Sequence, residues 1–282
     1  MIKSFKNGLS IGLGQWRTAL TGYLFQLLLA LTLGVQVYHV LEASIGNSLE
    51  INKLITGYDD TVVNDFLNGH GASLSPLIGQ LRWVLLVYML FSVFINAGLL
   101  YAVVKNKKGW KIFWEGGAAY FFPFFKLAVF FMVIALIWTA ALWLPLLSFL
   151  PNSTNVLPSE KTSVFLLCGV VVLYFTGLIF IFNWSAVSRI KTMEGNKKYW
   201  RAIGEGFKYV RKKFFPLAGL IFLFILMQLI LIAIYWWAES IWGMVSPLLI
   251  FVFFVAQQIF VYIRWLIKIS IYGGLKEYYF NK

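Results

Sequence analysis

The sequence predicts an all-α fold, a polytopic membrane bundle of six transmembrane helices. Hydrophobic residues make up 60% of the 282 residues and charged residues only 12%. Soluble domains carry about 45–50% apolar and about 25% charged residues. Several apolar runs also exceed the length that marks a membrane span, about 18 residues. The chain therefore lacks the polar side chains that would cover a water-soluble core.

The apolar runs define six expected spans. Their boundaries are Thr18–Leu41, Trp83–Val104, Pro123–Phe149, Val164–Val187, Pro216–Ala238 and Pro247–Ile263. At about 1.5 Å per residue, a helix of each length crosses the hydrocarbon core, although the last is close to the minimum. Proline begins three of these spans, at a first-turn position where its missing N–H costs nothing.

The basic residues gather on one side of these spans. All but three of the 24 Lys and Arg residues lie there, the exceptions being Lys53, Arg82 and Lys161, while most of the 11 acidic residues lie on the other side. The positive-inside rule then places both termini in the cytoplasm and predicts a multi-pass membrane protein. The net charge of +13 is explained by anionic headgroups of the cytoplasmic leaflet, without nucleic acid.

An internal repeat is indicated by the tripeptide Phe-Phe-Pro, which occurs at 121–123 and at 214–216. Before the second copy, apolar residues recur at spacings of three and four, which is typical of one helical face. They are Trp200, Ile203, Phe207, Val210 and Phe214. Basic residues occupy the opposite face. The pattern predicts an amphipathic helix at the membrane interface, named here an elbow helix.

Similar stripes precede the other two outgoing spans. When Gly8 is aligned on Gly206 without gaps, Thr18 falls opposite Pro216. The expected organisation is a single membrane domain, 1–282, with repeat 1 at 1–104, repeat 2 at 105–187, repeat 3 at 188–263, an amphipathic tail at 264–282 and an outer loop at 42–82. Homology and convergence both account for such a three-fold repeat.

Amide side chains are the polar groups placed deepest in the returning spans. They are Asn96, Asn183, Gln257 and Gln258. Intramembrane amides either line a ligand pathway or form hydrogen bonds between helices, and both interpretations stand for these four.

Basic side chains of the elbow helices and the tail are expected at the membrane surface. They are Lys3, Lys6, Lys111, Arg201, Lys208, Arg211, Lys212, Lys213, Arg264 and Lys268. Their expected partners are membrane lipids with anionic headgroups. Other membrane protein subunits are a further possibility.

Catalytic and metal motifs are not convincing. The segment Gly8–Gly12 matches the Gly-x-Ser-x-Gly pattern, but Ser10 lies on an expected elbow helix rather than a strand-turn-helix. Asp59, Asp60, Asp65 and His70 do not have calcium-loop spacing, which favours a solvated acidic loop. No zinc, Walker or dinucleotide-binding motif occurs. We therefore expect no enzyme activity, no cofactor and no metal.

The stretches "YWRAIGEGFKYVRKKFFPLAGL" and "FWEGGAAYFFPFFKLAV" resemble the repeated elbow motif of bacterial six-span membrane proteins. These include the membrane domain found beside some glycerophosphoryl diester phosphodiesterases, and related uncharacterised families. The soluble phosphodiesterase domain is absent from this chain, so the resemblance implies architecture and no activity.

The expected function is that of a non-enzymatic inner-membrane protein acting as a scaffold, an accessory subunit or a lipid-handling module. Its basic amphipathic helices would lie on the cytoplasmic leaflet. The alternative is a transporter or flippase-like carrier that moves a lipid or small apolar molecule through the bundle.

Overall fold

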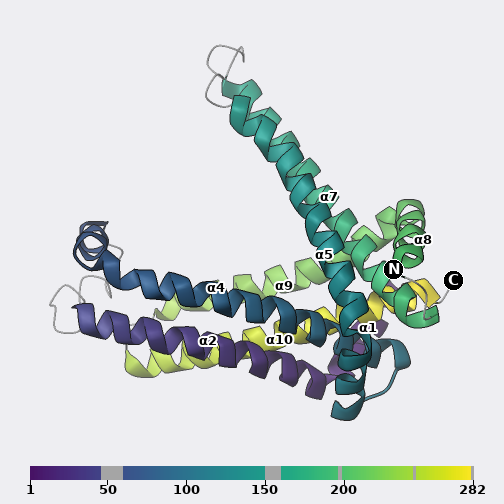
Figure 1. Cartoon of the computed structure of the whole chain (residues 1–282), viewed down its shortest axis with the longest axis horizontal. Helices are drawn as coiled ribbons and strands as arrows, with labels where there is room; N and C mark the ends of the chain where they lie inside the picture. The colour runs from purple at the N-terminus through teal and green to yellow at the C-terminus, as the bar shows by residue number, and fades with distance from the viewer. Residues whose placement is uncertain (46–59, 150–159, 196–198, 244–245, 281–282) are drawn as a thin grey trace. The chain divides into compact units, whose positions relative to one another are not determined.

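The computed structural model describes residues 1–45, 60–149, 160–195, 199–243 and 246–280. All regular elements in these ranges are helices (Figure 1). They are α1 (Ile2–Gly14), α2 (Trp16–Ile45), α4 (Asp60–Lys105), α5 (Trp110–Phe149), α7 (Glu160–Gly195), α8 (Tyr199–Lys212), α9 (Phe214–Trp242) and α10 (Pro247–Phe280). The expected all-α class is confirmed.

Six of these helices are long and apolar enough to cross a membrane, namely α2, α4, α5, α7, α9 and α10. Large apolar side chains are exposed along them, including Leu136, Phe251 and Trp236. Exposed apolar surface of this extent is stable only in contact with lipid. The chain is therefore a multi-pass membrane protein, as its composition predicts.

The chain divides into two compact units, one made of residues 1–20 and 93–282 and the other of residues 21–92. The second unit contains most of α2 and α4. There the rings of Phe25 and Phe91 stack at 4.3 Å between centroids, and Gln80 donates a hydrogen bond to the carbonyl of Thr32 at 3.2 Å. The first unit contains both termini and the remaining helices.

Two elbow helices are separate elements, as predicted. α1 ends at Gln15, whose N–H donates to the Gly12 carbonyl at 3.1 Å, and α2 follows directly. α8 ends in the same way at Lys213, whose N–H donates to the Val210 carbonyl at 3.1 Å before α9 begins. Gln15 and Lys213 are paired by the gapless alignment of Gly8 on Gly206, so the two breaks fall at equivalent positions, although the second expected stripe continued to Phe214.

The expectation of a separate elbow helix before the third span is wrong. α5 runs without interruption from Trp110 to Phe149 and carries Pro123 in its interior. Pro216 and Pro247 lie in the first turns of α9 and α10, as expected. The two Phe-Phe-Pro copies thus occupy different places, one at a helix start and one inside a helix.

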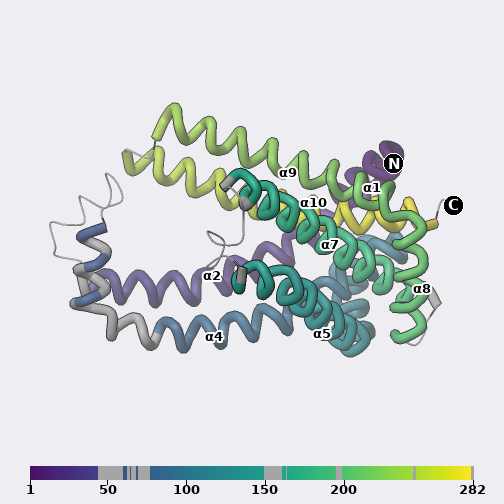
Figure 2. The backbone as a smooth tube through the Cα atoms, turned by 90° about the horizontal axis from the view of Figure 1, so that it is seen from above, coloured from purple at the N-terminus to yellow at the C-terminus, as the bar shows by residue number. Residues whose placement is uncertain are grey.

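The amphipathic tail is likewise not a separate segment. α10 continues from the membrane span through the tail to Phe280. Trp265, Ile269 and Leu275 are buried there rather than lying on a surface. α1 packs along this part of α10, and the ring of Phe5 lies 4.6 Å from that of Phe224 on α9. Both termini consequently lie at the same end of the first unit, named here the termini end, as both views show (Figure 1, Figure 2).

Each elbow segment crosses a returning span where the two backbones approach closely. A Cβ atom on Gly8 of α1 would lie 2.6 Å from the Ser270 carbonyl oxygen of α10. A Cβ on Gly206 of α8 would lie 2.5 Å from Ser188 Oγ of α7. At the third crossing the glycine is on the span, because a Cβ on Gly98 of α4 would lie 2.5 Å from the carbonyl oxygen of Phe113 at the start of α5.

These three crossings are arranged cyclically. Gly8, Phe113 and Gly206 each lie ten residues before the aligned positions Thr18, Pro123 and Pro216. The first elbow crosses the span that ends the third repeat, and the second and third elbows cross the spans that end the repeats before them. Small residues at helix crossings permit this close approach, which supplies packing energy where water cannot drive association.

Candidate functional site

The candidate site lies where α5, α7 and α8 meet. The indole N–H of Trp184 on α7 donates to the Ile203 carbonyl of α8 at 2.8 Å. Ile203 and Val210 are buried against α7, whereas Trp200 remains 61% exposed. The predicted apolar face of α8 is therefore divided: part of it packs on protein, and its aromatic residues remain accessible.

An aromatic cluster connects α8 to the hairpin formed by α5 and α7. Trp184 lies 5.0 Å from Phe207 and 5.0 Å from Phe131, measured between ring centroids. Phe180 also contacts Phe207 at 5.6 Å, and Phe130 contacts Trp200 at 5.7 Å. Most of these pairs have the edge-to-face geometry that aromatic rings prefer. The cluster fixes α8 against the base of the hairpin.

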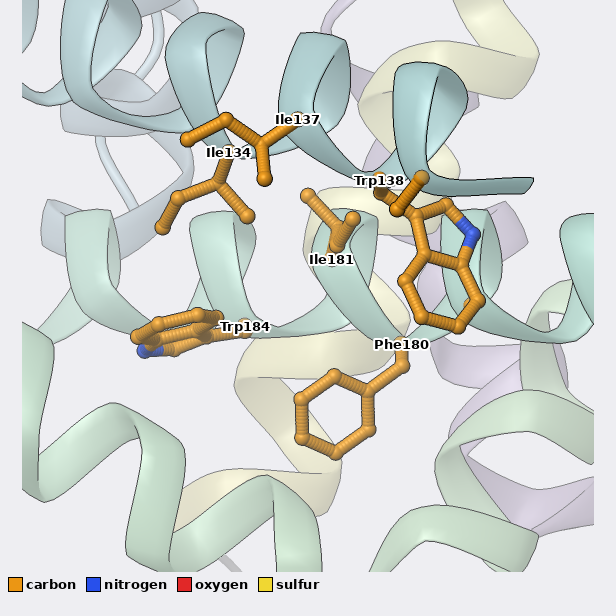
Figure 3. Close-up of a pocket in the computed structure, with 8 residues that line it drawn as sticks. Ile134, Ile137, Trp138, Phe180, Ile181 and Trp184 are labelled. Carbon is orange, nitrogen blue, oxygen red and sulfur yellow. The ribbon is translucent and has the colours of Figure 1, made fainter. Parts of the chain in front are cut away.

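A pocket of about 380 Å³ opens above this cluster between α5 and α7 (Figure 3). It is lined by Ile134, Ile137, Trp138, Ala141, Gly177, Phe180, Ile181 and Trp184. A Cβ on Gly177 would meet the Trp138 indole ring, so the absence of a side chain at Gly177 makes room for that ring. The Trp138 N–H donates to the Tyr174 carbonyl at 3.3 Å, which holds the indole in place.

The pocket is suited to an apolar ligand. Its lining is apolar apart from the two indole N–H groups, both of which already donate to backbone carbonyls. Trp184 lies five residues before Arg189, or about 7–8 Å along a helix axis. With Arg189 at the cytoplasmic interface, as the sequence predicts, Trp184 lies at the depth of acyl chains rather than headgroups, because half the hydrocarbon core measures about 15 Å. No reaction chemistry is available from such a lining.

The basic residues predicted for the membrane surface are mostly exposed. Eight are accessible, namely Lys3, Lys6, Lys111, Arg201, Lys208, Arg211, Lys212 and Arg264. Lys213 and Lys268 are partly buried. Arg201 and Lys191 both contact the carboxylate of Glu205, at 3.2 Å and 3.3 Å. That acid holds α8 against α7 at its polar side.

The four amides are not gathered into one pocket among the described residues. Asn183 is fully buried on α7 and donates to the Ile179 carbonyl at 3.0 Å, while its Oδ1 has no partner in the described chain. Asn96 Oδ1 is also buried without a partner there. Gln257 donates to Tyr235 Oη at 2.8 Å and lines a smaller pocket between α9 and α10, while Gln258 is half-buried on α10.

The motifs set aside on sequence grounds are placed as follows. Ser10 is exposed on α1, and no cluster of three His, Cys, Asp or Glu side chains occurs in the part of the chain that the structure describes. Asp60 begins α4 and is exposed. Asp59, and the side chains of Asp65 and His70, lie outside the described residues.

One titratable group at the site has a shifted pKa outside the spans. Burial, and to a smaller extent the neighbouring Tyr278, raises the pKa of Tyr209 on α8. Its ring lies 5.2 Å from that of Tyr279 on α10, and its hydroxyl is buried. Tyr209 is therefore a neutral packing residue at physiological pH.

The pocket was not predicted from the sequence, although a signal for it exists. Its α5 residues fall at 134, 137, 138 and 141, and its α7 residues at 177, 180, 181 and 184. Both sets follow the i, i+3, i+4, i+7 spacing of a single helical face. In a span that is apolar all round, this spacing cannot be distinguished from the background.

The fold and the pocket define the class of protein, a polytopic all-α membrane protein with an apolar pocket between two spans. No protein family model, curated protein or solved structure matches the chain.

Proposed function

We propose that the protein is a non-enzymatic lipid-handling module of a bacterial inner membrane, with both termini in the cytoplasm. The basic elbow helices at the termini end support this orientation through the positive-inside rule. An acyl chain of an anionic lipid would occupy the α5/α7 pocket, and its headgroup would lie beside the cations of α8.

The observation that carries this proposal is the position of α8. Its apolar residues Ile203 and Val210 are buried, its ring Phe207 touches the pocket residues Phe180 and Trp184, and its basic side chains are exposed. One short helix thus joins an apolar pocket to a cationic surface. An anionic lipid has two matching parts, an apolar acyl chain for the pocket and a negatively charged headgroup for the cationic surface.

The direct test is photolabelling of the reconstituted protein with phosphatidylglycerol that carries a diazirine in one acyl chain. We expect saturable labelling of residues 134–141 and 177–184. Unlabelled phosphatidylglycerol should compete better than phosphatidylcholine, because only the former is anionic and is attracted by the nearby cations.

Two neighbouring side chains provide a matched pair of variants. Ile137 lines the pocket and is 62% exposed, whereas Leu136 is 61% exposed and does not line it. Ile137→Trp should fill the pocket and reduce specific labelling roughly tenfold, the effect of losing about 1.4 kcal/mol of binding. Leu136→Trp adds the same ring on the lipid-facing surface and should leave labelling unchanged. Equal labelling in the two variants would count against the proposal.

A carrier role is the second candidate, and the unpartnered amide oxygens of Asn96 and Asn183 favour it. Buried acceptors of this kind cost free energy unless a ligand or water satisfies them. Lipid flux in proteoliposomes should then fall when both are replaced by Leu. Unchanged flux would contradict the carrier role and would favour a purely structural role for these two amides.

The scaffold and accessory-subunit roles stay predictions, as does the resemblance to the phosphodiesterase-associated membrane domain.

A further inference from the structure

Three cations lie close together where α7 and α10 meet at the termini end. Arg189 belongs to α7, and Arg264 and Lys268 belong to α10, one turn apart. α7 and α10 are in contact, and the positive charge of Lys268 is disfavoured first by burial and then by both arginines. Lys268 was expected to extend into the membrane surface, but the structure places it partly buried and next to two like charges.

Two of these cations each lie over an aromatic ring, and the described residues provide no carboxylate for any of the three. The Lys268 ammonium lies 4.5 Å from the centroid of the Trp265 ring, and the Arg189 guanidinium lies 5.8 Å from that of Phe124. The acid nearest in sequence to Arg189 on α7, Glu194, lies more than one turn further along the helix. No described ion pair includes Arg189, Arg264 or Lys268.

Arg189 also has an unused donor. Its Nε atom is buried and has no hydrogen-bond partner among the described residues. A buried guanidinium donor without an acceptor is costly, because hydrogen bonds to charged groups are among the strongest in proteins. Repulsion between three neighbouring cations adds to that cost, since charges that are partly buried are screened less than exposed ones. An anion between them would remove both penalties.

The charge and donor geometry favour one kind of anion. Three cations match a group that carries up to two negative charges and several acceptor oxygens, and guanidinium forks fit phosphate oxygens in pairs. We infer that Arg189, Arg264 and Lys268 form a phosphate-binding site, which takes either the phosphate of a lipid headgroup or free inorganic phosphate. The site does not depend on an acyl chain in the α5/α7 pocket.

The test uses the full chain reconstituted in nanodiscs of phosphatidylcholine. One series receives inorganic phosphate, and the other receives dioctanoyl phosphatidic acid, with sodium chloride at matched ionic strength as the blank. The measurements are the shift of the thermal unfolding temperature and the binding isotherm. Stabilisation by a ligand follows directly from its affinity for the folded state, so the two readouts should agree.

Lys268→Met and Arg264→Gln are the informative variants. We expect each to bind the phosphate probe roughly ten- to hundredfold more weakly, the loss typical of one charge-assisted contact. Without ligand, Lys268→Met should unfold at a higher temperature than the original protein, because one repelling charge is gone. Lys111→Met is the matched control, since Lys111 is an exposed cation at the start of α5, 13 residues before Phe124.

The two series separate the sources of phosphate. Stabilisation by phosphatidic acid alone identifies a lipid headgroup, and stabilisation by both probes or by inorganic phosphate alone identifies a site open to the free ion. The inference is overturned when neither probe stabilises the protein more than chloride does, or when Lys111→Met weakens binding as much as Lys268→Met. Ile137→Trp should retain the response to inorganic phosphate, so failure of the pocket proposal remains distinguishable.

Discussion

Gln15 and Lys213 have nearly the same backbone conformation, with φ −104° and ψ 28° at Gln15 and φ −123° and ψ 30° at Lys213. Each residue separates an elbow helix from a spanning helix. The following helix begins in the same way at both places, because the N–H of Ala19 donates to the Gln15 carbonyl and that of Leu217 donates to the Lys213 carbonyl. Two segments far apart in the sequence therefore share one backbone conformation at the break between the elbow helix and the spanning helix.

Close backbone approach at the elbow crossings should make one glycine intolerant of substitution. A Cβ at Gly8 would meet backbone atoms of Ser270 and Gly274, at 2.6 Å and 2.8 Å. Backbone cannot move aside as a side chain can, so Gly8→Ala should destabilise the protein by about 1–3 kcal/mol. Thermal unfolding in mild detergent measures this effect.

Gly204 provides the control for that substitution. It lies on the other separate elbow helix, α8, and a Cβ there would meet nothing within 4 Å. Gly204→Ala should stabilise the protein by up to about 1 kcal/mol, because alanine favours a helix over glycine. Opposite signs for the two variants are the expected result. A stabilising Gly8→Ala would contradict the crossing described here.

The two Phe-Phe-Pro copies should respond differently to loss of the proline. Pro123 lies inside α5, where its ring removes a backbone hydrogen bond, whereas Pro216 lies in the first turn of α9, where no donor is required. Pro123→Ala should therefore stabilise the protein by about 1 kcal/mol or more, and Pro216→Ala should change stability by less than about 0.5 kcal/mol. Thermal unfolding of both variants checks this, and equal shifts would contradict the different placements of the two prolines.

The sequence predicts the spans well, because a membrane helix must satisfy its backbone internally and cover about 30 Å with apolar side chains. The equivalence of two elbow segments also followed from aligning Gly8 on Gly206, but the positions of their breaks, Gln15 and Lys213, did not. The continuity of α5 through Pro123 could not be predicted. A proline is compatible with both a helix start and a tolerated position inside a membrane helix.

The site could be predicted only in its separate parts. Arg264 and Lys268 were identified as basic residues of the tail, but nothing in their spacing shows that Arg189 on α7 approaches them. Trp138 and Gly177 belong to runs that are apolar on all faces, so no periodicity distinguishes the pocket face from the lipid face. The cation cluster and the α5/α7 pocket both depend on contacts between segments that are distant in the sequence. A single sequence does not reveal such contacts.

The hydrogen bond from Trp184 to Ile203 should determine how firmly α8 is held. Trp184→Phe retains an aromatic ring in the cluster but removes the N–H donor, leaving the Ile203 carbonyl without that partner. The expected cost is about 1 kcal/mol. Hydrogen exchange of the α8 amides measures it, and exchange there should become faster while α9 stays protected. The control is Trp236→Phe, because Trp236 is 71% exposed on α9. Unchanged exchange in Trp184→Phe would show that ring packing and the Lys191–Glu205 ion pair hold α8 without this hydrogen bond.

The proposed orientation can be tested by chemical labelling. In a Cys168→Ser background, Lys161→Cys and Lys208→Cys place single thiols at exposed positions near opposite ends of the α5/α7 hairpin. A membrane-impermeant maleimide added to intact bacterial cells should label Lys161→Cys and should reach Lys208→Cys only after permeabilisation. Positive charge at the α8 end opposes its translocation, which is the reason for this expectation. The reverse pattern would invert the proposed topology.

Gly177 should control the size of the α5/α7 pocket. Its Cβ would meet the Trp138 indole, so Gly177→Ala must displace that ring and weaken its hydrogen bond to the Tyr174 carbonyl. The overpacking should cost about 1–3 kcal/mol and reduce photolabelling by the diazirine lipid. Gly169 lies on the same helix with nothing within 4 Å of a Cβ, so Gly169→Ala should leave labelling unchanged and should stabilise the protein by up to about 1 kcal/mol, as is expected for Gly204→Ala. A Gly177→Ala protein that is less stable but labels normally would show that the lipid does not use the space beside Trp138.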